Sequence, residues 1–308
     1  MEQYLIYIIQ SLILILLSPF FMGVIRRLKA FIRGYTGASL FQPYFDLARL
    51  FRKGRVISTS SSFVTRIAPI ISFAASASVM FLIPVFYTNS SLLGNLFVVI
   101  FLMSIIKFAN VLLGLDCAST FGGMGSSREL FISMFAEPVM FVIITFLYIE
   151  TKSFNIYKIS AVNGVISNYG VAHIIAAIAF FILLIAENAR MPVDNPETHL
   201  ELTMIHEAMI LDLSGRDLAL VELSSYMKFI AYITIFINCF CPFGIAQTLS
   251  FAAIIKGLSL LIIKMLICLG VISFNETLYA KFRLFRIPEI LAASFSIGIV
   301  AIAINFFR

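Results

Sequence analysis

The segment from residue 187 to residue 222 concentrates side chains that could carry protons. It holds eight of the chain's 16 acidic residues, which are Glu187, Asp194, Glu197, Glu201, Glu207, Asp212, Asp217 and Glu222. Apolar side chains such as Leu200, Met204 and Ile210 are interspersed with them, so part of the segment should be buried. Carboxylates grouped on a partly buried surface repel one another and resist dehydration, which raises the pKa of at least one of them. Such a group could bind and release a proton near neutral pH.

An ion-pair network is the alternative for the same carboxylates. If each of them has a cationic partner, the cluster is purely structural, because structural ion pairs also perturb pKa values. Arg190 and Arg216 are the candidate partners within the segment. The sequence leaves proton transfer and ion pairing open.

The middle of this segment is predicted to be a helix from about residue 196 to residue 213. Asn195 can cap its N-terminus, Pro196 suits its first turn and Gly215 can end it. The helical period then decides which side chains share a face. Carboxylates are expected on one face and histidines on the far face. The carboxylates are Glu197, Glu201 and Asp212, and the histidines are His199 and His206.

The composition is that of an integral membrane protein. Of 308 residues, 61% are hydrophobic and 12% are charged, and the mean hydropathy is +1.02. Soluble domains are about 45–50% apolar and about 25% charged. A soluble enzyme, a disordered chain and a secreted disulfide scaffold are therefore disfavoured. The net charge of +6 does not indicate a nucleic acid partner, since basic residues collect in the cytoplasmic loops of membrane proteins.

No metal or redox centre is expected in this chain. The four cysteines form neither a CxxC pair nor a spaced set of four ligands. They are Cys117, Cys239, Cys241 and Cys268. His206 and Glu207 do not begin an HExxH zinc motif, because residue 210 is isoleucine. Hydrogen-bonded packing is the favoured role for the histidines.

Eight apolar runs approach the roughly 20 residues that a membrane-spanning helix needs. They lie near residues 4–24, 64–87, 92–115, 130–149, 170–187, 227–248, 251–273 and 287–307. The chain is therefore predicted to be an all-α integral membrane protein, a single multi-spanning domain over residues 1–308. Two long cytoplasmic loops containing amphipathic helices, at about 25–63 and 187–227, are expected to be docking segments.

Basic residues orient this bundle. Of the 22 Lys and Arg, 16 lie in the segments that would join spans one to two, three to four, five to six and seven to eight. Lys228 is counted among them, in the loop before span six. Because cytoplasmic loops are enriched in Lys and Arg, both termini are expected on the outer side.

The first long loop contains a predicted basic amphipathic helix. Leu47, Leu50 and Phe51 are at helical spacing, with basic residues between them. The polar residues that mark this helix are Gln42, Pro43, Tyr44, Asp46, Arg49, Arg52 and Lys53. The helix could simply anchor the chain at lipid headgroups, or it could be a docking surface for a cytoplasmic partner.

Charged residues also occur inside the predicted spans. Lys107, Glu137 and Lys264 lie well within them, and such residues usually face a polar interior and mark ion pathways. Glu137 precedes Pro138, whose missing N–H frees a carbonyl one turn earlier. Lys256 and Glu276 lie near span ends, where their side chains are expected to reach the interface.

The same residues resemble a known family over essentially the whole chain. The run PVDNPETHLELTMIHEAM, from Pro192 to Met209, closely resembles the membrane subunit of formate hydrogenlyase and of group-4 membrane-bound [NiFe] hydrogenases. That subunit is homologous to the complex I subunit that contacts the quinone-binding arm. Six residues of this chain also resemble the loop signature shared by the wider family: Glu187, Arg190, Pro192, Asp194, Pro196 and Glu197. The segments 42–47 and 128–138 match as well.

This resemblance implies a subunit of the prokaryotic cytoplasmic (inner) membrane that binds no redox centre itself. The expected partners are the [NiFe] hydrogenase large and small subunits, a ferredoxin-like iron–sulfur subunit and an antiporter-like membrane subunit. Those partners would hold the [NiFe] centre and the iron–sulfur clusters. Glu137 and the loop carboxylates would form the entrance of a proton (or sodium) route.

Two other functions remain open from the sequence. The first is the quinone-site membrane subunit of respiratory complex I. That branch usually has an aromatic residue before the loop aspartate, whereas this chain has Val193, so a bound quinone is doubtful. The second is a stand-alone secondary ion transporter, which predicts inverted repeats that the sequence does not show.

Overall fold

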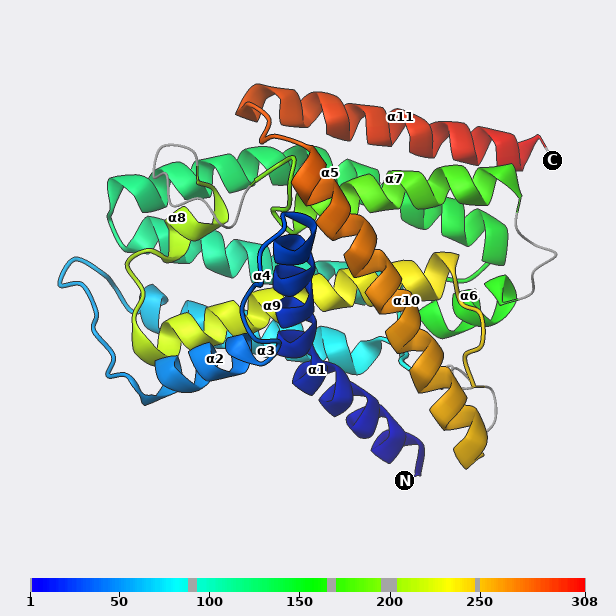
Figure 1. Cartoon of the computed structure of the whole chain (residues 1–308). Coiled ribbons are helices and arrows are strands. Elements are labelled where there is room, and N and C mark those ends of the chain that lie inside the picture. The colour runs from blue at the N-terminus through cyan, green and yellow to red at the C-terminus, as the bar shows by residue number, and fades with distance from the viewer. Residues whose placement is uncertain (1, 88–92, 165–169, 195–203, 247–249, 308) are drawn as a thin grey trace.

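The structure is a computed structural model that describes residues 2–87, 93–164, 170–194, 204–246 and 250–307 (Figure 1). The ordered elements in these ranges are helices, which confirms the predicted all-α class. They are α1 (Glu2–Ile32), α2 (Gln42–Arg52), α3 (Val64–Leu82), α4 (Leu96–Asp116), α5 (Thr120–Thr151), α6 (Ile156–Asn163), α7 (Val171–Glu187), α8 (His206–Ile210), α9 (Gly215–Phe240), α10 (Phe251–Leu278) and α11 (Ile287–Phe306), with the 3-10 turn η2 (Leu284–Arg286) before α11.

Within the described residues, seven helices are long and apolar enough to cross a bilayer: α1, α3, α4, α5, α9, α10 and α11. The apolar helix α7 has 17 residues, about 26 Å at 1.5 Å per residue, which is close to the minimum for a span. Each of the eight predicted spans therefore has a helical counterpart. One continuous cluster of buried apolar side chains includes residues from all eight helices.

The segment before α9 differs from its prediction. Between residues 204 and 213, only His206–Ile210 is helical, so the predicted helix to residue 213 is wrong there. Gly215 does not end a helix but begins α9, with φ of 55°. A Cβ on Gly215 would lie 2.4 Å from the Gly54 carbonyl oxygen, so the first long loop passes directly against this glycine. Span six accordingly starts at residue 215 rather than 227, and Lys228 lies inside it.

Helix α1 is adapted to a proline in its middle. Pro19 cannot donate to the carbonyl of Ile15, and the Ser18 hydroxyl donates to that carbonyl instead, at 2.9 Å. Further along, a Cβ on Gly23 would lie 2.0 Å from the Leu40 carbonyl oxygen. The chain leading into α2 thus packs closely on α1.

The helices place the two loop regions at one end of the bundle. In Figure 1, α8 and the chain between α2 and α3 lie at the left, whereas α6 and the C terminus lie at the right. Helix α11 packs against α5 and α7, and α10 crosses in front of α9 with contacts to α1 and α9. The charged residues of the site come mainly from the C-terminal part of α1, the end of α7, the short helix α8 and residues 222–229 of α9.

Candidate functional site

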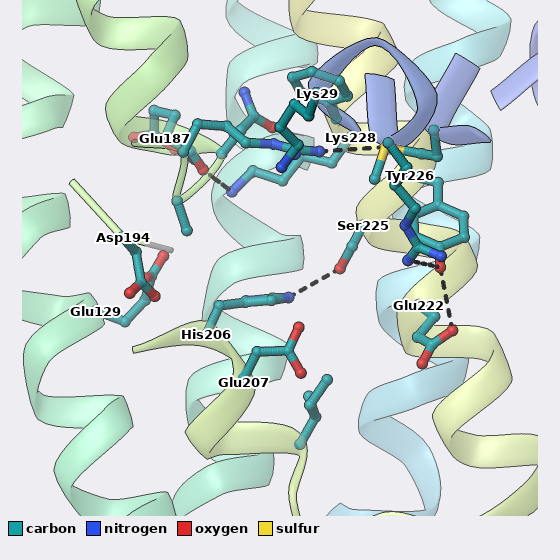
Figure 2. Close-up of a pocket in the computed structure, with 17 residues that line it drawn as sticks. Lys29, Glu129, Glu187, Asp194, His206, Glu207, Glu222, Ser225, Tyr226 and Lys228 are labelled. Carbon is teal, nitrogen blue, oxygen red and sulfur yellow. Dashed lines mark hydrogen bonds and ion pairs between the residues drawn. The ribbon is translucent and has the colours of Figure 1, made fainter. Parts of the chain in front are cut away.

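A cavity of about 490 Å³ opens between α1, α5, α9 and the chain that follows α7 (Figure 2). Seventeen residues line it, and nine of them are charged. The nine are Arg26, Lys29, Glu129, Glu187, Arg190, Asp194, Glu207, Glu222 and Lys228. The structure therefore brings four of the carboxylates of the acidic segment (Glu187, Asp194, Glu207 and Glu222), together with Arg190 and His206, around one space.

Glu187, the last residue of α7, is buried at one wall of the cavity. Its Oε1 lies 3.0 Å from the Lys107 Nζ, and its Oε2 lies 3.7 Å from the Lys228 Nζ. The Tyr232 hydroxyl donates to Oε2 at 3.2 Å, and the Lys228 ammonium also donates to the Glu187 backbone carbonyl at 2.7 Å. A buried carboxylate is tolerated only with such partners, because its hydration is lost.

Lys107 also faces a second carboxylate. Its Nζ lies 3.7 Å from the Glu137 Oε1 on α5, so this single ammonium is shared between Glu187 and Glu137. The Lys107 side chain is 8% exposed, whereas the Glu137 side chain is 49% exposed. Glu137 therefore lies at the protein's surface within an apolar helix. Lys107 connects the cavity with that surface.

Glu276 differs from its prediction. It does not reach the interface but is 3% exposed, with ion pairs to Lys29 at 2.6 Å and to Arg190 at 3.4 Å. The Arg190 guanidinium also lies over the Phe229 ring, 4.3 Å from its centroid. Helix α10 crosses α1 beside the cavity, and this crossing places the Glu276 carboxylate between two cations. The carboxylate is therefore buried in ion pairs instead of extending to the aqueous interface.

Asp194 holds the chain between α7 and α8. Its Oδ2 accepts a hydrogen bond from the Ile205 backbone N–H at 3.2 Å, and its Oδ1 pairs with Lys281. The Phe282 N–H donates to the Pro192 carbonyl at 2.9 Å. The segment after α10 thus supports the signature loop, and the cation that neutralises Asp194 comes from there rather than from Arg190 or Arg216.

Two carboxylates of the cavity are not in ion pairs. Among the described residues, neither Glu129 nor Glu222 has a cationic nitrogen within 4.0 Å. Glu222 accepts a hydrogen bond from the Tyr226 hydroxyl at 3.3 Å, and Arg26 lies near the same hydroxyl, at 3.5 Å (Figure 2). Within the described residues, the cavity is thus lined both by acids in ion pairs with cations, such as Glu187 and Asp194, and by two acids without such a partner.

His206 lies on α8 at the cavity wall, and its Nε2 lies 3.0 Å from the Ser225 hydroxyl. Burial lowers the pKa of its imidazole below the usual value; Lys228 and Arg190 add to this, and Glu207 and Asp194 oppose it. In the unfolded chain a histidine has a pKa of about 6.5. As the pH falls below that value, the unfolded chain binds a proton that the folded protein does not bind, so the folded state loses stability.

We therefore expect His206→Gln to reduce the loss of unfolding free energy between about pH 7.5 and about pH 5.5. The measurement is the denaturant unfolding of the purified protein at several pH values, with the wild type in parallel. Parallel pH curves for the two proteins would contradict this role of His206.

The remaining predicted residues lie elsewhere. Asp212 and Arg216 are exposed and do not line the cavity, and Lys264 donates to the backbone carbonyls of Cys241 and Phe243 beyond α9. In α2, the Gln42 side-chain amide donates to the Asp46 carboxylate at 2.9 Å, and Pro43 is buried. The Tyr44 hydroxyl donates to the Leu16 carbonyl. The basic residues Arg49, Arg52 and Lys53, the last of which directly follows α2, are exposed. Pro196, Glu197, His199 and Glu201 lie outside the described residues.

Sequence analysis missed five members of the site: Lys29, Glu129, Lys228, Tyr232 and Glu276. Lys228 and Tyr232 are four residues apart and therefore share a face of α9, a spacing that could have identified them. Glu276 is the only acidic residue of α10, and an isolated acid in an apolar helix is itself a signal. Lys29 and Glu129 carried no comparable signal, since each looked like an ordinary residue at the end of a span.

The chain is similar to known proteins over almost its whole length. The chain matches the NADH dehydrogenase family over residues 4–306. It is 29% identical over 294 residues to hydrogenase-4 component C of Escherichia coli (strain K12), covering 95% of this chain and 92% of that protein. It is 24% identical over 300 residues to formate hydrogenlyase subunit 4 of the same strain, covering 96% of each.

A solved structure has the same fold. A chain of the membrane-bound sulfane sulfur reductase, an archaeal respiratory membrane complex, superposes with a TM-score of 0.82 and 18% sequence identity. The superposition covers 97% of this chain and 99% of that chain. Together with the family match over almost every residue, this shows that the protein, a multi-pass membrane protein, belongs to the NADH dehydrogenase family.

Proposed function

We propose that this protein is the membrane-anchoring and coupling subunit of a formate hydrogenlyase-type [NiFe] hydrogenase complex. It docks the peripheral redox subunits and links their electron transfer to proton (or sodium) movement. The two Escherichia coli relatives, both components of hydrogenase systems by name, support this assignment. In this role the chain would contribute ionisable side chains, and the redox centres would belong to partner subunits.

The observation that carries the coupling role is the series Glu187, Lys107 and Glu137. It runs from a cavity at the loop end of the bundle to a half-exposed carboxylate within an apolar helix. A charge at mid-helix costs roughly 2.5–3.5 kcal/mol on insertion scales, so a purely structural chain gains nothing from placing Glu137 there. A route for an ion would need a group of this kind.

The ion pair of Lys107 provides a simple coupling step. A change of charge in a docked redox subunit alters the field in the cavity and thereby the protonation of its carboxylates. When Glu187 takes up a proton from the cavity, Lys107 loses its closest counter-ion and can move toward Glu137, which is already only 3.7 Å away. The positive charge is thus displaced toward the protein's surface.

We expect different partners at the two ends of the Glu187–Lys107–Glu137 series. The loops at about 25–63 and 187–227 would dock the hydrogenase large and small subunits and a ferredoxin-like iron–sulfur subunit. The half-exposed Glu137 would be covered by an antiporter-like membrane subunit rather than by lipid. The loop end would face the cytoplasm, with both termini on the outer side of the cytoplasmic membrane, as the distribution of Lys and Arg indicates.

A quinone-site subunit of complex I is the second candidate, and the size of the cavity favours it. Its lining does not suit a quinone, because nine of the 17 lining residues are charged and few apolar side chains, such as Met22 and Phe229, are available for the ring. Extraction in mild detergent separates the two candidates. Nickel and iron co-purifying with the chain support the hydrogenase, and a bound quinone supports complex I.

The coupling role is tested by replacing Glu137 and, separately, Glu201 with glutamine. In inverted membrane vesicles, dyes that report pH and membrane potential should show ion translocation abolished, while the complex still assembles and still transfers electrons. Glu289→Gln is the matched control, because Glu289 is an exposed glutamate at the start of α11. Wild-type translocation in both variants would refute the proposal.

A further inference from the structure

Helix α2 presents one continuous stripe of side chains away from the protein. Phe41, Phe45, Arg49 and Arg52 follow one another at spacings of three or four residues, and all are exposed. The opposite face packs against the bundle through Pro43 and Leu47, which are buried. The stripe therefore changes from aromatic at its N-terminal end to basic at its C-terminal end.

The aromatic end lies deep along α1. The Tyr44 hydroxyl donates to the carbonyl of Leu16, and the Phe41 ring centroid is 6.1 Å from that of Phe20. Leu16 is about 24 Å from the end of α1 at Ile32, by the rise of an α-helix. Phe41 and Phe45, 56% and 60% exposed, thus project beside an apolar part of a spanning helix.

The basic end lies at the surface of the bundle. Immediately after α2, the backbone passes against Gly215, the first residue of α9, and Arg55 pairs with Asp217, two residues further along α9. Arg49, Arg52 and Lys53 are exposed here, and the part of the chain that the structure describes provides none of them with an ion pair. These three exposed cations are therefore available to an anion from outside the protein.

We propose that α2 is a binding site for anionic phospholipid. The phosphates would contact Arg49, Arg52 and Lys53, and the acyl chains would pack on Phe41 and Phe45. A water-soluble partner would meet the basic end but could not reach the aromatic end, whereas one lipid layer offers both chemistries at the right depths. The proposal does not rest on the hydrogenase assignment; it gives the outer face of α2 to the membrane and leaves the rest of the 25–63 segment for docking of peripheral subunits.

This lipid site lies beside the cavity. Asp46 of α2 is 3.8 Å from Arg26, which lines the cavity and contacts Tyr226. Lipid bound along the outer face of α2 would hold the helix against α1 and α9, and with it Arg26. Membrane composition would therefore influence the position of Arg26 in the cavity wall.

The experiment compares the full-length protein in nanodiscs of phosphatidylcholine with and without added phosphatidylglycerol. After transfer to detergent, native mass spectrometry measures the phosphatidylglycerol that stays bound. With roughly a fivefold effect for each cation, Arg49→Gln/Arg52→Gln/Lys53→Gln is expected to weaken retention by about a hundredfold. Arg49→Lys/Arg52→Lys should keep most of it, because the charge is retained.

The control variant is Lys152→Gln/Lys158→Gln, which removes two exposed lysines near the end of α5 and in α6, at the other end of the bundle. It should retain lipid as the wild type does, and all variants should melt at the wild-type temperature. Wild-type retention by the triple glutamine variant would overturn the proposal. So would a triple variant that keeps its lipid but loses co-purifying peripheral proteins, since α2 would then be a protein docking surface.

Discussion

Replacing Lys107 with methionine is expected to lower the free energy of unfolding by about 3 kcal/mol. The substitution keeps the approximate length of the side chain but leaves the buried Glu187 carboxylate with only the more distant Lys228, at 3.7 Å, and the Tyr232 hydroxyl. Removing one partner of a buried ion pair typically costs about 3–5 kcal/mol, because the other charge stays without hydration. Because Lys228 and Tyr232 still contact the Glu187 carboxylate, we expect a cost at the lower limit of this range.

A double-mutant cycle separates the pair from its surroundings. Lys107→Met/Glu187→Gln should cost about 1–3 kcal/mol less than the sum of the two single substitutions, since neither charge is then left alone. Lys256→Met is the control, because Lys256 is exposed on α10 and its loss should be nearly neutral. Reversible unfolding in mixed micelles measures all four variants. Strictly additive single effects would show that the two groups do not interact.

Replacing Glu276 with glutamine is expected to have a similarly large effect, about 3–5 kcal/mol. The amide has the shape of the carboxylate but no charge, so Lys29 and Arg190 become two buried cations facing each other without a counter-ion. Arg190 also carries the start of the signature loop, through its N–H to Ile185 and its carbonyl to Val193. The loop should therefore loosen together with α10.

Two measurements identify this effect. The unfolding free energy of Glu276→Gln should fall, while that of Glu289→Gln, an exposed glutamate on the next helix, should stay within about 0.5 kcal/mol of the wild type. Limited proteolysis should cut the variant faster between α7 and α8. An unchanged stability would mean that Glu276 lies at a hydrated interface after all, as its position near the end of an apolar run suggested.

The acidic segment from residue 187 to residue 222 differs from its prediction in which acids gather and in which cations they pair with. The shared face predicted for Glu197, Glu201 and Asp212 does not form the site: Asp212 is exposed and away from the cavity, and the other two lie outside the described residues. The acids of the segment that line the cavity are Glu187, Asp194, Glu207 and Glu222. The predicted partners were wrong, because Asp194 pairs with Lys281 and Arg190 pairs with Glu276. Those cations and acids are close in space but about 87 residues apart in the chain.

The number, type and approximate position of the membrane helices followed from local composition. An apolar run must leave water and satisfy its own backbone hydrogen bonds, and a helix is the simple solution. This physics acts within one segment, so periodicity and run length were sufficient for it. Turn chemistry was less informative. Gly215 could equally end one helix or begin another, and the passing backbone of Gly54 decided between them.

Pairing of charges depends on which helices become neighbours, and no local pattern carries that information. The sequence predicts Lys228 in a loop, yet α9 begins early enough to bury it beside Glu187. The sequence also predicts Glu276 at the interface, yet α10 crosses α1 and encloses this carboxylate with Lys29. Hydration is lost only when the bundle packs, so the ionic partners, the shared position of Lys107 and the cavity itself arise from assembly of the helices rather than from any one of them.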